Sequence, residues 1–267
     1  MNITLTMHPS KMDNAPYIAL IHGMGSAATA WKPLTPHLLD RFNVITVDLP
    51  GHGKSAFTKG QAMDPTSVAE QVVRQVESEL GSIEFDLVGN SWGGWIALEI
   101  AANFPEKITS VTALAPAGFW LASYVQRAPG TAALQFLAKN SALLAPVYLK
   151  YEWARKLGFA DVSPHWRTFS YDLCLDATMA MGKSSGYFPA WDGMLSKRFD
   201  SQIDQSIPVK IIFGDSDNTL PETTCQERAM APVHSEWITI AECGHAPMWD
   251  NVETVAEHIL EIAGKQR

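Results

Sequence analysis

A chain of 267 residues, 46% of them hydrophobic and 18% charged, can bury a large core, which excludes a disordered protein. Its formal net charge is −8 and no basic cluster is longer than Lys197-Arg198, which argues against nucleic acid and anionic membrane surfaces as partners. The three cysteines, Cys174, Cys225 and Cys243, lack the spacing of a disulfide framework or a zinc site, so we expect a reducing compartment. Because the sequence shows neither a secretory signal nor an apolar run of about 18 residues, we expect a cytoplasmic protein without a membrane span.

Strand-like and helix-like segments alternate over the first part of the chain. The expected strands are Tyr17 to Ile21, Val44 to Val47, Phe85 to Val88 and Ile108 to Leu114. The expected helices are Ala28 to Asp40, Pro65 to Leu80 and Trp92 to Phe104. This order of elements, with nearly continuous apolar strands, predicts βαβ units and a parallel sheet covered by helices on both faces.

The pattern changes after Gly118. Residues 119 to about 206 are helical or irregular and rich in aromatic side chains. The alternation of elements then resumes with a strand at Val209 to Phe213, a helix near Glu222 to Met230, a strand at Trp237 to Ile240 and a helix at Val252 to Ala263. We therefore expect an α/β core made of residues 1–118 and 207–267, interrupted by a mostly helical insertion of residues 119–206.

One serine stands between glycines where a strand gives way to a helix. Ser91 follows Gly89 and precedes Gly93 in the segment Leu87 to Ile100. Glycines in these places allow a backbone turn so tight that β-carbons would collide. Such a turn exposes the serine above the sheet, at the positive end of the following helix. The pattern Gly-x-Ser-x-Gly between a strand and a helix indicates a nucleophilic serine.

With this motif the chain resembles the α/β-hydrolase family over nearly its whole length apart from the insertion. The stretch His22-Gly23-Met24-Gly25 looks like the oxyanion loop of that family. Asp48 to Ser55 looks like its common turn after the next strand. The resemblance implies an α/β-hydrolase fold, with a mostly parallel central sheet, helices on both faces and an inserted helical cap over the active site.

A nucleophilic serine needs a base to take its proton, and in this fold an acid and then a histidine follow it along the chain. We expect His245 to be the base, because it lies in a Gly/Pro loop directly after a strand. The family pattern places the acid three residues after Gly214, at Asp217. Asp215 is the alternative acid, and is otherwise interpreted as a turn residue.

The oxyanion of such a reaction needs backbone N–H donors. The residue after the nucleophile, Trp92, supplies one, and by resemblance Met24 supplies the other. Trp120, at the entry to the insertion, and Met248-Trp249, just after the histidine, are candidate residues of the substrate pocket.

A serine in this motif, rather than an aspartate, predicts acyl transfer to water. We expect a serine hydrolase that cleaves a carboxylic ester of a small or medium-size, largely apolar substrate through an acyl-enzyme, without a metal or other cofactor. A carbon–carbon bond hydrolase of the meta-cleavage-product type is one alternative, because Gly-Asn-Ser-x-Gly-Gly resembles that subgroup as well. The other alternative is a small-ligand sensor that retains the triad Ser91, Asp217 and His245. The sequence makes no prediction of the oligomeric state.

Overall fold

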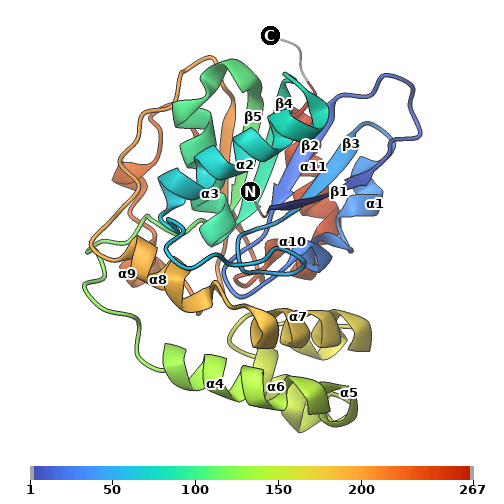
Figure 1. Cartoon of the computed structure of the whole chain (residues 1–267), viewed down its shortest axis with the longest axis vertical. Coiled ribbons are helices and arrows are strands. Elements are labelled where there is room, and N and C mark those ends of the chain that lie inside the picture. Colours follow the sequence, from blue (N-terminus) through green and yellow to red (C-terminus); the bar gives the residue numbers. More distant parts are fainter. Residues whose placement is uncertain (1–2, 265–267) are drawn as a thin grey trace.

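The computed structural model describes residues 3–264 and contains a seven-stranded sheet in the order β1-β3-β2-β4-β5-β6-β7 (Figure 1). β1 pairs with β3 in an antiparallel manner, and the other neighbouring strands pair in parallel. The strands are β1 (Thr4–His8), β2 (Tyr17–Ile21), β3 (Asn43–Asp48), β4 (Phe85–Asn90), β5 (Ile108–Leu114), β6 (Val209–Gly214) and β7 (Glu236–Ile240).

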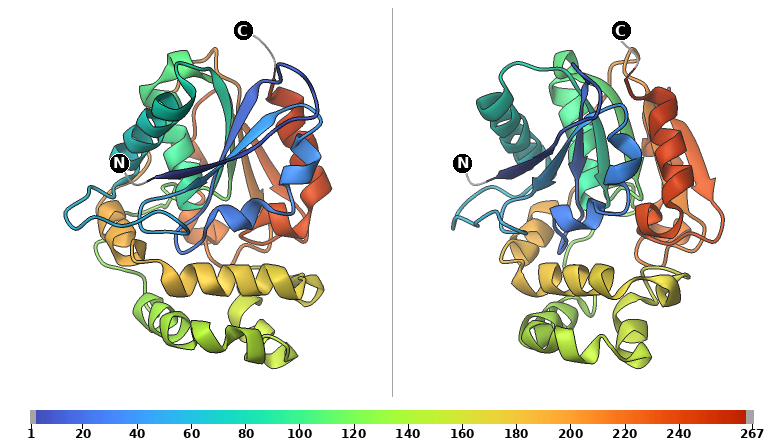
Figure 2. Two further views of the ribbon diagram at one scale, coloured as in Figure 1. Left: turned by 45° about the vertical axis from the view of Figure 1, so that its right-hand side comes forward. Right: turned by 90° about the vertical axis from the view of Figure 1, so that its right-hand side faces the viewer.

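Helices cover both faces of this sheet, as Figure 2 shows in its right-hand view. In β2, Ala19 and Ile21 pack into a core shared with α2 and α3, whereas Ile18 and Leu20 pack into a second core shared with α11. A strand that is covered by helices on both sides has no solvent-exposed face, which explains why its sequence is an unbroken apolar run. The helices around the sheet are α1 (Thr35–Leu38), α2 (Pro65–Leu80), α3 (Trp92–Asn103), α9 (Glu222–Cys225), α10 (Pro247–Asp250) and α11 (Val252–Ile262).

A helical insert joins β5 to β6. It contains α4 (Thr131–Ser141), α5 (Ala145–Tyr148), α6 (Glu152–Phe159), α7 (Tyr171–Lys183) and α8 (Tyr187–Met194), with short 3-10 turns η3 (Ala142–Leu144) and η4 (Trp166–Thr168). The insert lies across one end of the sheet, with α7 next to the core and α4, α5 and α6 farther out (Figures 1 and 2). Contacts between the insert and the loops after β2 and β3 place it at the carboxyl ends of the parallel strands.

The α/β-hydrolase fold expected from the sequence is confirmed, and three local expectations differ. The sequence does not predict β1, because this edge strand is only half-buried and alternates threonine with larger side chains. The helix expected at Ala28 to Asp40 is instead the 3-10 turn η1 (Ala28–Trp31) and the short α1, with Pro33 and Pro36 in the segment. Proline lacks the N–H that a continuous helix requires.

The helix expected near Glu222 to Met230 is also interrupted. It consists of α9 and the 3-10 turn η5 (Arg228–Met230). Between them the backbone leaves helical geometry at Gln226, whose buried side-chain amide donates to the carbonyl of Leu220. Across residues 3–264 we find no helix that combines the length and the apolar character needed to cross a bilayer.

Candidate functional site

Ser91 lies at the sharp turn between β4 and α3. Its φ of 56° and ψ of −120° are a conformation that residues with a β-carbon rarely adopt. A β-carbon at Gly89 would collide with the carbonyl of Gly93, and one at Gly93 would collide with the carbonyls of Ile21 and His22. The two glycines therefore permit the turn, and a strained backbone at the serine of this motif points to a functional position.

The loop after β2 packs directly against this serine. A β-carbon at Gly23 would lie 3.0 Å from the β-carbon of Ser91. The preceding residue, His22, accepts the backbone N–H of Leu49 at Nε2 (3.0 Å), so its Nδ1 carries the proton and donates to the carbonyl of Gly23 (2.7 Å). Burial lowers the pKa of His22 to about 4, which keeps the ring neutral. His22 therefore braces the loops after β2 and β3 against each other.

A buried carboxylate joins the same two loops. Asp48, at the end of β3, accepts the backbone N–H of Ala28 (2.7 Å) and that of Lys54 (3.1 Å). His52 lies in the second of these loops, and its ring centroid is 5.5 Å from that of His22 and 5.7 Å from that of Trp92. Its Nδ1 is 2.9 Å from the carbonyl of Pro50, whereas its buried Nε2 has no hydrogen-bond partner among the described residues. Burial and then His22 lower the pKa of His52 to about 3.

His245 and Asp217 meet at the same edge of the sheet. Asp217 follows β6, and its Oδ2 lies 2.9 Å from Nδ1 of His245, in the loop after β7. The other carboxylate oxygen accepts the backbone N–H groups of Thr219 (2.9 Å) and Leu220 (2.8 Å). Burial alone would raise the pKa of Asp217, but His245 and these N–H groups outweigh it and hold the pKa below its ordinary value. The carboxylate is therefore charged and held in one orientation.

Asp215, the alternative acid, lies in a different environment. It is exposed and accepts hydrogen bonds from the Ser216 hydroxyl (2.8 Å) and the backbone N–H of Cys243 (3.4 Å). Asp215 thus holds the turn after β6, whereas Asp217 is the carboxylate that contacts His245.

The backbone at His245 is fixed from two sides. The side-chain amide of Asn90 donates to the carbonyl of His245 (3.0 Å) and to that of Leu114 (3.1 Å). From the insert, the carbonyl of Val162 accepts the backbone N–H of His245 (2.8 Å). Neither contact is predicted from the sequence, although Asn90 stands inside the serine motif.

The insert supports the histidine loop at a second point. Asp250 accepts the backbone N–H of Gly244 (2.7 Å) and the hydroxyl of Ser163. Burial raises the pKa of Asp250. Since Ser163 belongs to the segment between α6 and η4, the insert and the loop that carries His245 form one hydrogen-bonded unit.

The structure thus brings His245 and Asp217 into direct contact and joins them to the serine motif through Asn90. Within residues 3–264 no hydrogen bond joins the Ser91 hydroxyl to the His245 ring. Trp92 begins α3, so its backbone N–H belongs to the first turn, where helical N–H groups have no intrahelical acceptor. Met24 lies half-buried on the loop that packs against Ser91.

The three candidate pocket residues each contact another part of the protein through a hydrogen bond or through packing in the core. The indole N–H of Trp120 donates to the carbonyl of Lys197 (2.8 Å), and that of Trp249 donates to the carbonyl of Ala30 (2.9 Å). Met248 is buried in the core on the α11 side of the sheet. A role for these three side chains in substrate binding stays a prediction.

Two other side chains of the insert reach the loop after β2. A β-carbon at Gly25 would lie 2.7 Å from Sδ and Cε of Met181, on α7, and 3.1 Å from a ring carbon of Tyr187, on α8. Nothing in the sequence distinguishes these two from the other apolar residues of the insert, because their position depends on how the insert folds over the core.

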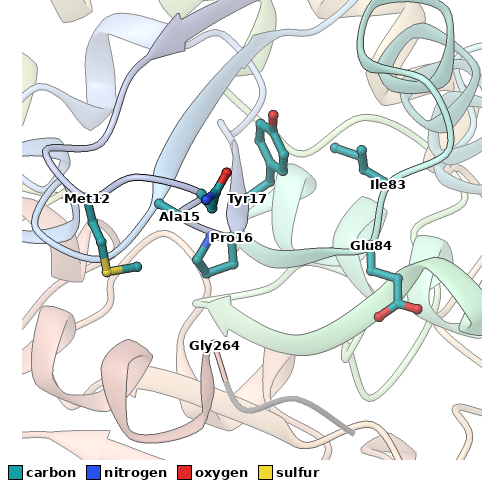
Figure 3. A pocket seen from close by; sticks show the side chains of 8 residues that line it. Met12, Ala15, Pro16, Tyr17, Ile83, Glu84 and Gly264 are labelled. Carbon is teal, nitrogen blue, oxygen red and sulfur yellow. The ribbon is translucent and has the colours of Figure 1, made fainter.

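A separate hollow of about 710 Å³ lies at the opposite edge of the sheet (Figure 3). Its lining includes Tyr17, which begins β2, Ile83 and Glu84, which directly precede β4, and Gly264, which follows α11. Ligands of parallel α/β sheets bind at the carboxyl ends of the strands, so this hollow is not part of the candidate site. In the described part of the chain, no group of three or more histidine, cysteine, aspartate or glutamate side chains is arranged to hold a metal ion.

Comparison with known proteins agrees with the α/β-hydrolase fold described above. The family described as the alpha/beta hydrolase family matches residues 18–258. An uncharacterized protein of Mycobacterium tuberculosis is 28% identical over 89% of this chain and 72% of its own, and a monoacylglycerol lipase of Homo sapiens is 24% identical over 92% and 75%. A thermophilic esterase from Thermogutta terrifontis superposes with a TM-score of 0.73 at 19% identity, over 97% of this chain and 92% of that one.

Proposed function

Because the chain belongs to the alpha/beta hydrolase family, we propose that it hydrolyses a carboxylic ester of a small or medium-size, largely apolar substrate through an acyl-enzyme on Ser91. The observation that carries this proposal is the contact between Asp217 and His245 at the edge of the sheet where Ser91 occupies its strained turn. A serine, a histidine and an oriented carboxylate are the groups that acyl transfer requires.

In the proposed mechanism, Ser91 Oγ attacks the ester carbonyl while His245 accepts the hydroxyl proton at Nε2. Asp217 holds Nδ1–H of His245 and stabilises the imidazolium that forms. The backbone N–H groups of Met24 and Trp92 donate to the oxyanion of the tetrahedral intermediate. His245 then gives its proton to the leaving alcohol, and a water molecule attacks the acyl-enzyme by the same steps to release the acid.

We further propose that residues 119–206 form a cap that shapes the acyl pocket. Met181 and Tyr187 of the insert contact the loop that carries Met24, which supports an apolar acyl group. The relative from Homo sapiens is a monoacylglycerol lipase, and the solved structure from Thermogutta terrifontis is an esterase, so both names agree with an ester substrate.

The test is hydrolysis of p-nitrophenyl esters from acetate to palmitate by the wild type and by Ser91→Ala. We expect turnover with an optimum of acyl length, and a fall in kcat of at least about a thousandfold in the variant. A serine-directed fluorophosphonate should add its mass to the wild type and not to Ser91→Ala. Full activity of Ser91→Ala would disprove the assignment.

The same preparation tests the two alternatives. Hydrolysis of a vinylogous diketone without turnover of any ester would favour the carbon–carbon bond hydrolase. Saturable binding of a small ligand with turnover slower than minutes would favour the sensor.

A further inference from the structure

The helix α4 has an unusual distribution of side chains. Its buried residues are Thr131 and Gln135, and the side facing α7 is so close that a β-carbon at Gly182 would meet the Ala138 carbonyl. The large apolar residues of this helix are exposed instead: Leu134, Phe136 and Leu137 are 50%, 64% and 59% exposed. A helix that packed only against its own protein would bury these residues and expose the threonine and glutamine.

The exposed apolar surface continues through the next three elements. Leu143, on η3, is 84% exposed, and Leu157, on α6, is 78% exposed. We define the outer face of the insert by the exposed large apolar residues of this segment: Leu134, Phe136, Leu137, Leu143, Leu144, Val147, Tyr151, Trp153 and Leu157. These elements form the layer farthest from the sheet, beyond α7 (Figure 2). An apolar surface gathered in this way indicates an interaction site, whereas single exposed apolar residues do not.

The charges on this face are mostly positive. Lys139, Lys150 and Lys156 are exposed there, and Arg155 is partly exposed. The acidic residue between 131 and 157, Glu152, forms an ion pair with Arg167 (3.1 Å between Nε and Oε1). The chain as a whole has a net charge of −8, so the rest of the molecule carries the negative charge and this face is the exception.

We propose that the outer face of the insert docks onto an anionic lipid bilayer. A bilayer places negative headgroups above an apolar layer, and the face offers lysines among leucines in the same arrangement. Tyr151 and Trp153 have the amphipathic rings that favour the level of the headgroups. The negative charge elsewhere on the molecule is repelled by the same surface and so favours docking through this face.

A second copy of the chain is a poorer match for the same face. A two-fold dimer sets the same surface of each subunit against the other, which would bring the lysines of one copy toward those of its partner. The total charge and the short basic runs of the sequence argue against an anionic membrane surface, but neither describes how charge is distributed over the folded chain. Lys139, Lys150 and Lys156 do not form a run in the sequence, and in the structure all three are exposed on the segment from α4 to α6, which lies farthest from the sheet (Figure 2).

The first experiment is flotation of the whole protein with vesicles, which requires no activity and so does not depend on the proposed function. We expect the protein to float with vesicles of phosphatidylcholine and phosphatidylglycerol, and much less with phosphatidylcholine alone. Leu143→Ser with Leu157→Ser should lower the bound-to-free ratio on the order of tenfold for each leucine removed from the bilayer. The matched control, Met12→Ser with Val233→Ser, replaces two exposed apolar residues outside the insert and should bind as the wild type does.

A second pair of variants tests the charges. Lys150→Glu with Lys156→Glu should abolish the preference for the anionic vesicles, whereas Lys11→Glu with Lys59→Glu, outside the insert, should preserve it. The proposal is overturned if the wild type floats with neither vesicle, or if the control variants lose as much binding as the variants of the outer face. It is also overturned, in favour of a second copy, if the wild type is a dimer that does not float and the leucine variant is a monomer in sedimentation velocity.

Discussion

The side chain of Asn90 donates a hydrogen bond to the backbone carbonyl of His245, 155 residues later in the chain. The residue next to the proposed nucleophile therefore positions the loop of the proposed base. The same amide also donates to the carbonyl of Leu114, so one side chain ties β4, β5 and the histidine loop together.

This relationship predicts that Asn90→Ala lowers kcat roughly tenfold to a hundredfold while KM changes little. The variant leaves two buried carbonyls without this donor, which should also lower the free energy of unfolding by about 1–3 kcal/mol. Ester kinetics and urea unfolding measure the two effects. Asn103→Ala is the matched control, because Asn103 donates to Glu99 within α3 and not to the histidine loop. Equal kinetic losses in both variants would show that Asn90 has no special role.

The two aspartates after β6 should differ strongly in their effect on catalysis. Asp217→Asn removes the charge beside His245 and allows the wrong ring tautomer, so kcat should fall by about a thousandfold to ten-thousandfold. Asp215→Asn changes an exposed turn and should leave kcat within about twofold. Both variants should be folded by circular dichroism before their kinetics are compared. The opposite ranking would assign the acid to Asp215.

The pattern of strands was sufficient to predict the α/β fold and to place His245 near the loop after β6, and the resemblance to the family favoured Asp217 over Asp215 in that loop. Buried parallel strands appear as apolar runs, and their carboxyl ends share one edge, so residues that follow different strands can be placed together. The sequence was not sufficient for contacts that depend on how loops and the insert pack. Val162 and Ser163 support the histidine loop through a backbone carbonyl and a hydroxyl that no local pattern distinguishes.

The free energy of unfolding should depend on pH through two buried, neutral histidines, His22 and His52. In the unfolded chain a histidine titrates near pH 6.5, whereas the pKa is about 4 for His22 and about 3 for His52 in the folded protein. As the pH falls below about 6.5, the unfolded chain therefore binds protons that the folded chain does not. The free energy of unfolding should fall with each histidine by on the order of 1.4 kcal/mol per pH unit until its folded-state pKa is reached.

The variant His52→Phe separates the contribution of His52 to this pH dependence from that of His22. The variant keeps an aromatic ring between His22 and Trp92 but cannot take up a proton. We expect a shallower loss of stability between about pH 6 and pH 4 in urea unfolding. The exposed His37→Phe should follow the wild-type curve. An unchanged slope in His52→Phe would mean that the pKa of His52 in the folded protein is not lowered from its value in the unfolded chain.

Met181→Ala should shift the preferred acyl length of the ester substrate upward. Met181 extends from α7 to within 2.7 Å of the position of a β-carbon on Gly25, next to the proposed oxyanion donor Met24. Removing three heavy atoms there should raise kcat/KM for long esters relative to short ones by about tenfold or more, since a single methylene is worth about 1–3 kcal/mol in an apolar pocket. The p-nitrophenyl ester series measures this ratio. Met179→Ala, two residues earlier and packed among the insert's own apolar residues, is the control and should leave the ratio unchanged. An equal fall in kcat/KM for all esters in Met181→Ala would mean that the Met181 side chain supports the loop and does not limit the length of the acyl pocket.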